Sequence, residues 1–167
     1  APFDHFTVAN VLAPGAGAAI RADFPRLAQP GLFPADDVWA GPAFARLLAE
    51  IRGPAVAEAF SEKFGVDLAG RPLMVTVRGR CRARDGRIHN DSADKVVTAL
   101  LYFNDGWADS GGRLRLLRGA TDIEDYLAEI PPLDGTLVAF RRSGNSWHGH
   151  RPYEGERRYV MFNWMTR

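Results

Sequence analysis

The chain has 167 residues, enough for one domain with a hydrophobic core of its own. Its 21 basic and 20 acidic residues give a formal net charge of +1, so neither a nucleic acid nor an anionic membrane is expected as the main partner. Cys81 is the only cysteine, which excludes an internal disulfide and a cysteine-based zinc site. With no basic leader and no apolar run of roughly 18 residues, we expect a cytoplasmic protein.

Helices are predicted in the first third of the chain. Each of three segments begins with a proline and is followed directly by a proline or a glycine, a pattern typical of helix boundaries: 14–24, 42–52 and 54–64. The segment 25–41, which separates the first two, is rich in proline and glycine and predicts an irregular surface segment.

From residue 71 the apolar pattern has a period of two. In 73–84 the odd positions are apolar or small, which predicts a half-buried strand. The even positions form a cationic face: Arg78, Arg80, Arg82 and Arg84. We expect this arginine face to be solvated and paired with acids such as Glu58 and Glu62. The alternative is that part of it borders the entrance to a site and selects an acidic or carboxylate-bearing substrate.

More strands are predicted downstream, separated by turns: 95–103, 112–118, 135–141, 146–150 and 157–165. The segment 121–133 fits either a short helix or a loop. Many short strands after a helical opening predict a mainly β protein with flanking helices, built as a barrel or a double-sheet jelly roll. We expect a single domain over 1–167, with helical support over about 1–70 and a β-core over about 71–167.

A metal site is suggested by His89 and Asp91, which stand two residues apart and so project from one face of a strand. An imidazole with a carboxylate suits iron, manganese, zinc or nickel rather than calcium. A third ligand is available downstream in His148 or His150. Two histidines and a carboxylate form a facial triad that leaves three metal positions open, whereas an isolated H-x-D more often marks a surface hydrogen bond.

Two further residues are expected in the same cavity. In 157–165 the face that begins with Arg158 is the more apolar, so we expect it to point inward. A buried arginine needs an anion, either an internal acid or a bound carboxylate. In 95–103 only one face bears hydroxyls, which places Thr98 and Tyr102 in the cavity. There Tyr102 donates to the same carboxylate or to a backbone group.

These features together resemble the Fe(II)- and 2-oxoglutarate-dependent oxygenases, in particular their prolyl-hydroxylase-like branch. The resemblance covers about residues 72–165 and rests on an ordered set of motifs: H-x-D at His89 and Asp91, "LLYFNDGW" followed by "GGRLRLL", "GTLVAF", and "SWHGHRP" with Arg158 ten residues after His148. The sequence departs from the family pattern at two places. Family members often have a tyrosine nine or ten residues before the first histidine, where this sequence has Gly79 and Arg80. They often have a small hydroxylated residue four positions after the arginine, where this sequence has Phe162.

The resemblance implies a double-stranded β-helix, or cupin-like jelly roll, in which His89, Asp91 and His148 hold Fe(II). It further implies that 2-oxoglutarate is anchored by Arg158 with help from Tyr102 and Thr98. Oxygen would be the second cosubstrate and ascorbate an accessory reductant. The presence of Asp91 favours hydroxylation over halogenation, because halogenating relatives replace this carboxylate by a small residue.

Three functions stay open at this point. The first is hydroxylation of a prolyl residue in a protein or peptide. The second is the same chemistry on a free amino acid or another small molecule. The third is a cupin-like metal-binding or ligand-binding module without turnover. The sequence specifies neither the substrate nor the oligomeric state.

Overall fold

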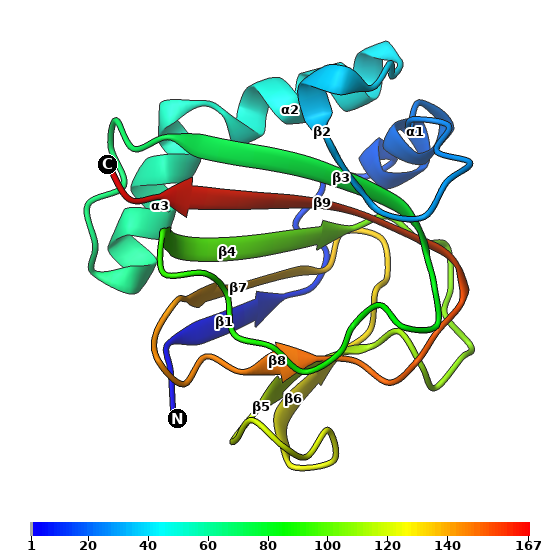
Figure 1. Ribbon diagram of the computed structural model, residues 1–167. Helices are drawn as coiled ribbons and strands as arrows, with labels where there is room; N and C mark the ends of the chain where they lie inside the picture. The colour runs from blue at the N-terminus through cyan, green and yellow to red at the C-terminus, as the bar shows by residue number, and fades with distance from the viewer. Residues whose placement is uncertain (1) are drawn as a thin grey trace.

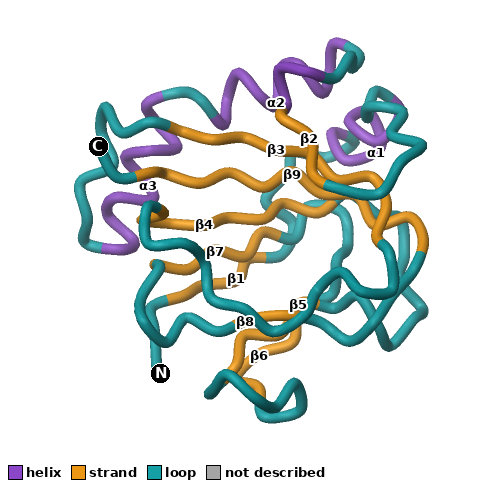
Figure 2. The backbone as a smooth tube through the Cα atoms, viewed as in Figure 1, coloured by secondary structure: helices purple, strands orange, loops and turns teal. Residues whose placement is uncertain are grey.

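Two antiparallel sheets face each other in the computed structural model, which describes residues 2–167 (Figures 1 and 2). The larger sheet contains, in spatial order, β1 (His5–Val8), β7 (Leu137–Arg141), β4 (Lys95–Tyr102), β9 (Gly155–Met165), β3 (Leu73–Cys81) and β2 (Leu32–Pro34). The smaller sheet contains β6 (Tyr126–Ile130), β5 (Leu114–Leu117) and β8 (His148–Gly149). The expected mainly β jelly-roll architecture is therefore confirmed.

The helices lie along the outer face of the larger sheet (Figure 1). They are α1 (Ala16–Ala22), α2 (Pro42–Ile51) and α3 (Pro54–Phe64), with a short 3₁₀ turn at Ala35–Asp37. Proline occupies the first turn of α2 and α3, where its missing N–H removes no helical hydrogen bond. All three predicted helices are present. Within the described residues, none is both long and apolar enough to cross a bilayer.

The larger sheet is buried on both of its faces. Its outer face packs under the helices through residues such as Val77, Val160 and Trp164, which are at most 2 % exposed. Its inner face packs against the smaller sheet through Leu100 and Phe140, among others. Burial on both faces explains why its central strands have nearly continuous apolar sequences.

Replacing Phe44 by alanine should test the helix-to-sheet core. Its ring is fully buried and packs edge-on against Phe24, with ring centroids 5.1 Å apart. We expect Phe44→Ala to lower the free energy of unfolding by about 3–5 kcal/mol, measured by urea denaturation. Arg46→Ala, on the exposed face of the same helix, should change it by less than about 0.5 kcal/mol. Equal effects of the two substitutions would contradict this packing.

Three short strands depart from the sequence predictions. The strand β1 precedes the helices, β2 lies within the segment predicted to be irregular, and β6 lies within the segment predicted to be a helix or loop. β1 and β2 are edge strands of the larger sheet and β6 is an edge strand of the smaller one. Edge strands of three to five residues depend on pairing with distant partners, so their local pattern is weak.

Candidate metal centre

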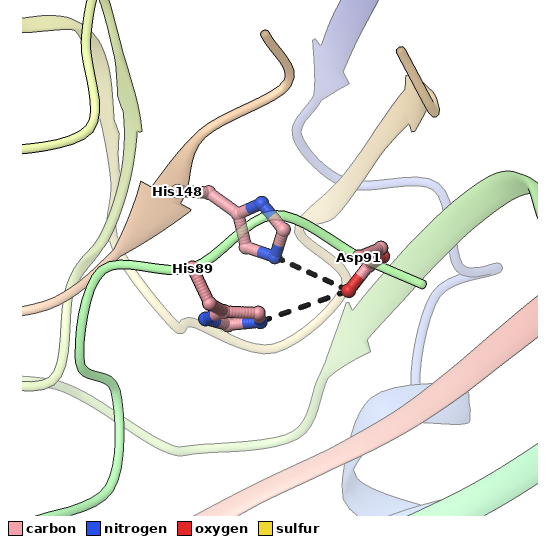
Figure 3. Close-up of side chains that lie close together, drawn as sticks. All are labelled: His89, Asp91 and His148. Carbon is pink, nitrogen blue, oxygen red and sulfur yellow. Dashed lines mark ion pairs between the residues drawn. The ribbon is translucent and has the colours of Figure 1, made fainter. Parts of the chain in front are cut away.

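Three potential metal ligands meet between the two sheets (Figure 3). His89 and Asp91 lie in the segment that leads into β4, and His148 begins β8. The backbones of His89 and His148 exchange two hydrogen bonds, of 3.0 and 3.1 Å between N and O. One nitrogen or oxygen from each of the three side chains lies within 4.8 Å of the others. Oδ1 of Asp91 is 3.6 Å from Nε2 of His89 and 3.7 Å from Nε2 of His148.

Hydrogen bonds to the backbone orient both imidazoles. Nδ1 of His89 lies 2.9 Å from the carbonyl oxygen of Arg87, and Nδ1 of His148 lies 2.9 Å from that of Ser146. A carbonyl oxygen only accepts, so each Nδ1 carries the proton and donates it. In the neutral form of each ring the lone pair is then on Nε2, which faces Asp91, and this is the tautomer that binds a metal.

The Asp91 carboxylate is fixed by a short chain of hydrogen bonds. The hydroxyl of Thr98 donates to Oδ2 of Asp91 at 2.6 Å and accepts from the amide of Asn163 at 2.8 Å. Oδ1 is thereby left for a metal. Burial opposes ionisation of Asp91, but the nearby His148, the Thr98 hydroxyl and Lys95 outweigh it and hold the pKa of this carboxyl below its usual range.

The two downstream histidines have different surroundings. Burial and the neighbouring His89 lower the pKa of His148 to about 4, so its ring is neutral and able to coordinate at physiological pH. Burial and Arg157 lower the pKa of His150 to about 4 as well. His150, however, donates through Nδ1 to the carbonyl of Arg151 and is not part of the three-ligand group.

A cavity of about 230 Å³ adjoins the three ligands. It is lined by Thr98 and Leu100 of β4 and by Arg157, Tyr159 and Met161 of β9. The β4–β9 register places Leu100 opposite Met161 and Tyr102 opposite Tyr159, so these residues share the inner face. Thr98 therefore lines the cavity as expected, whereas Tyr102 is fully buried behind the lining residues and contacts Arg157.

The arginine in this cavity is Arg157, and the expectation that Arg158 points inward is wrong. The Arg158 side chain lies on the opposite face of β9, where it is 31 % exposed, pairs with Glu156 at 3.0 Å and lies over the ring of Phe24. The more apolar face of β9 packs under the helices instead of facing the cavity. The hydroxyls of β4 indicate correctly which face of that strand points inward. The β4–β9 register shows that the inward face of β9 is the one with Arg157, Tyr159 and Asn163.

Arg157 is 2 % exposed and has no carboxylate partner among residues 2–167. Its Nε donates to the carbonyl of Gly112 at 2.7 Å, and its Nη2 lies 3.3 Å from the hydroxyl of Tyr102. The guanidinium carbon lies 5.3 and 5.0 Å from the ring centres of Tyr102 and Tyr159. A buried cation without a counterion is costly. Such a site favours an anionic ligand.

The arginine face of β3 is divided by an irregularity in the β3–β9 pairing between Arg78 and Arg80. Arg78 lines the cavity, whereas Arg80, Arg82 and Arg84 are exposed. The expected pairing with Glu58 and Glu62 is wrong. Arg78 instead contacts Asp85 at 2.9 Å and donates to the hydroxyl of Tyr159 at 2.8 Å.

Removing the Thr98 hydroxyl should weaken metal binding. Thr98→Val keeps the shape of the side chain but frees Oδ2 of Asp91, and hydrogen bonds of this kind typically contribute about 10–100-fold to metal affinity. We expect a loss of that size in the Fe(II) affinity, measured by anaerobic titration. Thr76→Val is the matched control, because the Thr76 hydroxyl is buried in the same sheet without a partner. A loss of affinity in both variants would contradict a specific role for Thr98.

Comparison with known proteins places this geometry in a family. Residues 80–166 match the model of the 2OG-Fe(II) oxygenase superfamily. The chain belongs to this family. No curated protein sequence is similar enough to count as a match.

Several solved structures share the fold of this oxygenase. A Pseudomonas putida prolyl-4-hydroxylase has a TM-score of 0.71 and 22 % identity, over 99 % of this chain and 86 % of that one. HygX from Streptomyces hygroscopicus, with nickel and 2-oxoglutarate bound, has a TM-score of 0.65 and 16 % identity, over 98 % and 82 %. A Trichoplax adhaerens prolyl hydroxylase, in complex with a hypoxia inducible factor peptide, has a TM-score of 0.64 and 16 % identity, over 97 % and 83 %.

The protein is thus a 2-oxoglutarate-dependent non-haem iron dioxygenase, and its donor set fits that metal. Two neutral imidazoles and one carboxylate are the protein ligands of oxygenase iron sites. When bound, Fe(II) and 2-oxoglutarate activate oxygen for the oxidation of a C–H bond. The alternative of a metal-binding module without turnover is set aside by the family assignment.

Proposed function

We propose that this oxygenase hydroxylates an unactivated C–H bond in a prolyl residue of a protein or peptide. The structural similarity to two prolyl hydroxylases, one of them in complex with a peptide, supports this substrate class. The observation that supports the oxygenase chemistry is Arg157, a buried cation in the cavity next to the three ligands, for which residues 2–167 provide no acid partner.

In this proposal each residue of the cavity has a distinct role. His89, Asp91 and His148 hold the iron through Nε2, Oδ1 and Nε2. Arg157 forms the salt bridge to the distal carboxylate of 2-oxoglutarate, which is the role that the family resemblance implied for Arg158. Tyr102 donates a hydrogen bond to the same carboxylate; burial raises the pKa of its phenol to about 12, so the proton stays on the oxygen.

The remaining walls add apolar surface to the cavity, from Leu100, Leu114 and Met161. A cosubstrate that covers these walls reduces the access of water, which strengthens the attraction between a guanidinium and a carboxylate.

Hydroxylation of a free amino acid or another small molecule is the second candidate. HygX, which has the same fold, was solved with nickel, 2-oxoglutarate and hygromycin B bound, so the fold accepts a small molecule as well as a peptide.

A substrate panel separates the two candidates. The iron-loaded enzyme is incubated with 2-oxoglutarate, oxygen and either proline-containing peptides or free amino acids. Succinate formation and a mass gain of one oxygen atom are then measured. A gain of oxygen by the peptides supports the proposal, and a gain by the free amino acids alone supports the second candidate. If neither class gains oxygen or stimulates succinate formation, both candidates are contradicted.

A further inference from the structure

A second cation, Lys95, lies at the metal ligands. Its Nζ is 3.3 Å from Oδ1 of Asp91, the same oxygen that faces both histidines. Its side chain is only 14 % exposed and lines the cavity. Asp91 is its only ion-pair partner among the described residues. A metal bound to Oδ1 competes for this partner, which leaves the ammonium group free to meet another anion.

A bulge at the start of β4 directs Lys95 into the cavity. The β4–β9 pairing shifts by one residue between Lys95 and Val97. As a result, Val96 and Val97 both pack toward the helices, although strict alternation predicts Val96 on the cavity side with Thr98. A bulge re-aims neighbouring side chains in this way. Lys95 thus enters the cavity at a position that the alternating pattern assigns to the outer face.

Lys95 and Arg157 lie near opposite ends of β4. Along β4 the order is Lys95, Thr98, Tyr102. Thr98 contacts Asp91, and Tyr102 contacts Arg157. Thr98 and Tyr102 are four residues apart, or about 13 Å along an extended strand. A cosubstrate held between the metal and Arg157 occupies the part of the cavity on the Tyr102 side of Thr98. The ammonium of Lys95 then borders the space left for the substrate.

The charges of the cavity do not balance without a further anion. Five charged side chains line it: Arg78, Asp85, Asp91, Lys95 and Arg157. These are three cations against two carboxylates, a net charge of +1. A divalent metal and the doubly negative 2-oxoglutarate cancel each other, so the loaded cavity keeps that positive charge. Arg78 is already paired with Asp85, and Arg157 with the cosubstrate. The unpaired cation is Lys95.

We propose that Lys95 recognises a carboxylate on the primary substrate, close to the C–H bond that is oxidised. This inference rests on the proposed function and narrows its substrate class. The carboxylate belongs either to a small molecule or to an acidic residue next to the target residue in a peptide. Both sources present the same chemistry to the ammonium group.

Matched pairs of probes test the inference. N-acetyl-L-proline is compared with N-acetyl-L-prolinamide, and a peptide containing Pro-Glu with one containing Pro-Gln. Each probe is titrated without oxygen into the enzyme loaded with Fe(II) and 2-oxoglutarate, and binding is followed through the visible metal-to-ligand charge-transfer band. Oxygen gain by the probes is measured separately. The variants are Lys95→Met, Lys95→Glu and, as a control, Lys63→Met at the only other lysine, which is exposed on α3.

We expect the wild type and Lys63→Met to bind the acidic member of at least one pair about 10-fold or more tightly than the neutral one, which corresponds to 1.4 kcal/mol. Lys95→Met should abolish this preference and Lys95→Glu should reverse it. The pair that responds identifies the source of the carboxylate. Provided that the charge-transfer band forms, two results overturn the inference. One is equal binding of the acid and the amide by the wild type, and the other is a preference for the acid that Lys95→Met retains. Absence of the band itself contradicts the proposed function instead.

Discussion

Replacing Arg157 by methionine is expected to raise the KM for 2-oxoglutarate by roughly 100-fold. The substitution removes the buried cation that we assign to the distal carboxylate, and losing one partner of a buried charge-assisted pair costs about 3 kcal/mol or more. Initial rates of succinate formation measure the effect. Anaerobic titration of the charge-transfer band measures it again, independently of turnover.

Arg158→Met is the matched control for this prediction. Arg158 is the next residue along β9, but its side chain lies on the outer face and pairs with Glu156. We expect this variant to keep a KM close to that of the wild type, whereas an anchoring role for Arg158 requires the opposite result. Arg157→Lys keeps the charge without the planar fork and should have an intermediate KM. The thermal stabilisation that 2-oxoglutarate gives the wild type should be lost in Arg157→Met.

The helices were predictable from the sequence because their signals are local. Proline at the start of α2 and α3 and a following glycine fix their ends within a residue or so. The edge strands β1 and β6 were not predictable from the sequence, because a strand of four or five residues is defined by its partner in another part of the chain. Tyr126–Ile130 contains leucine, alanine and glutamate, which favour a helix in isolation, and pairing with β5 overrides that preference.

The site was predictable where spacing and motif decide it. His89 and Asp91 are two residues apart, and the distal ligand follows a family motif, so all three ligands are recognisable in the sequence. The inward arginine was not predictable from apolarity, because β9 is buried on both faces and its more apolar face packs under the helices. On a sheet of this kind the polar face is the one that lines the catalytic cavity.

The bulges could not be predicted from the sequence pattern, for a different reason. A bulge shifts the pairing by one residue, and in a strand that is apolar on both faces, as β4 is, the sequence pattern does not show it. One bulge aims Lys95 at Asp91, and another irregularity separates Arg78 from Arg80. The first adds a cation to the cavity, whereas the second follows Arg78, which faces the cavity by regular alternation opposite Tyr159. The position of Lys95 therefore depends on a register shift that only the paired strands reveal.

Replacing His148 by alanine should have the largest effect of all on iron binding. The imidazole is one of the three ligands that we assign to the iron, and its Nε2 is fixed toward Asp91 by the hydrogen bond from Nδ1 to Ser146. Loss of a direct ligand should exceed the 10–100-fold cost of losing an outer-shell contact, so we expect the Fe(II) affinity to fall by more than about 100-fold and succinate formation to disappear. Iron content after gel filtration and anaerobic titration measure the loss.

His150→Ala distinguishes a lost ligand from a damaged cavity wall. His150 is equally a buried histidine of the same segment, but its ring donates to the carbonyl of Arg151 and stays outside the three-ligand group. We expect this variant to bind one iron per chain as the wild type does. If both variants lose iron to the same extent, the downstream ligand cannot be assigned to His148. If only His150→Ala loses it, His150 is the downstream ligand instead of His148, and the assigned group of His89, Asp91 and His148 fails with it.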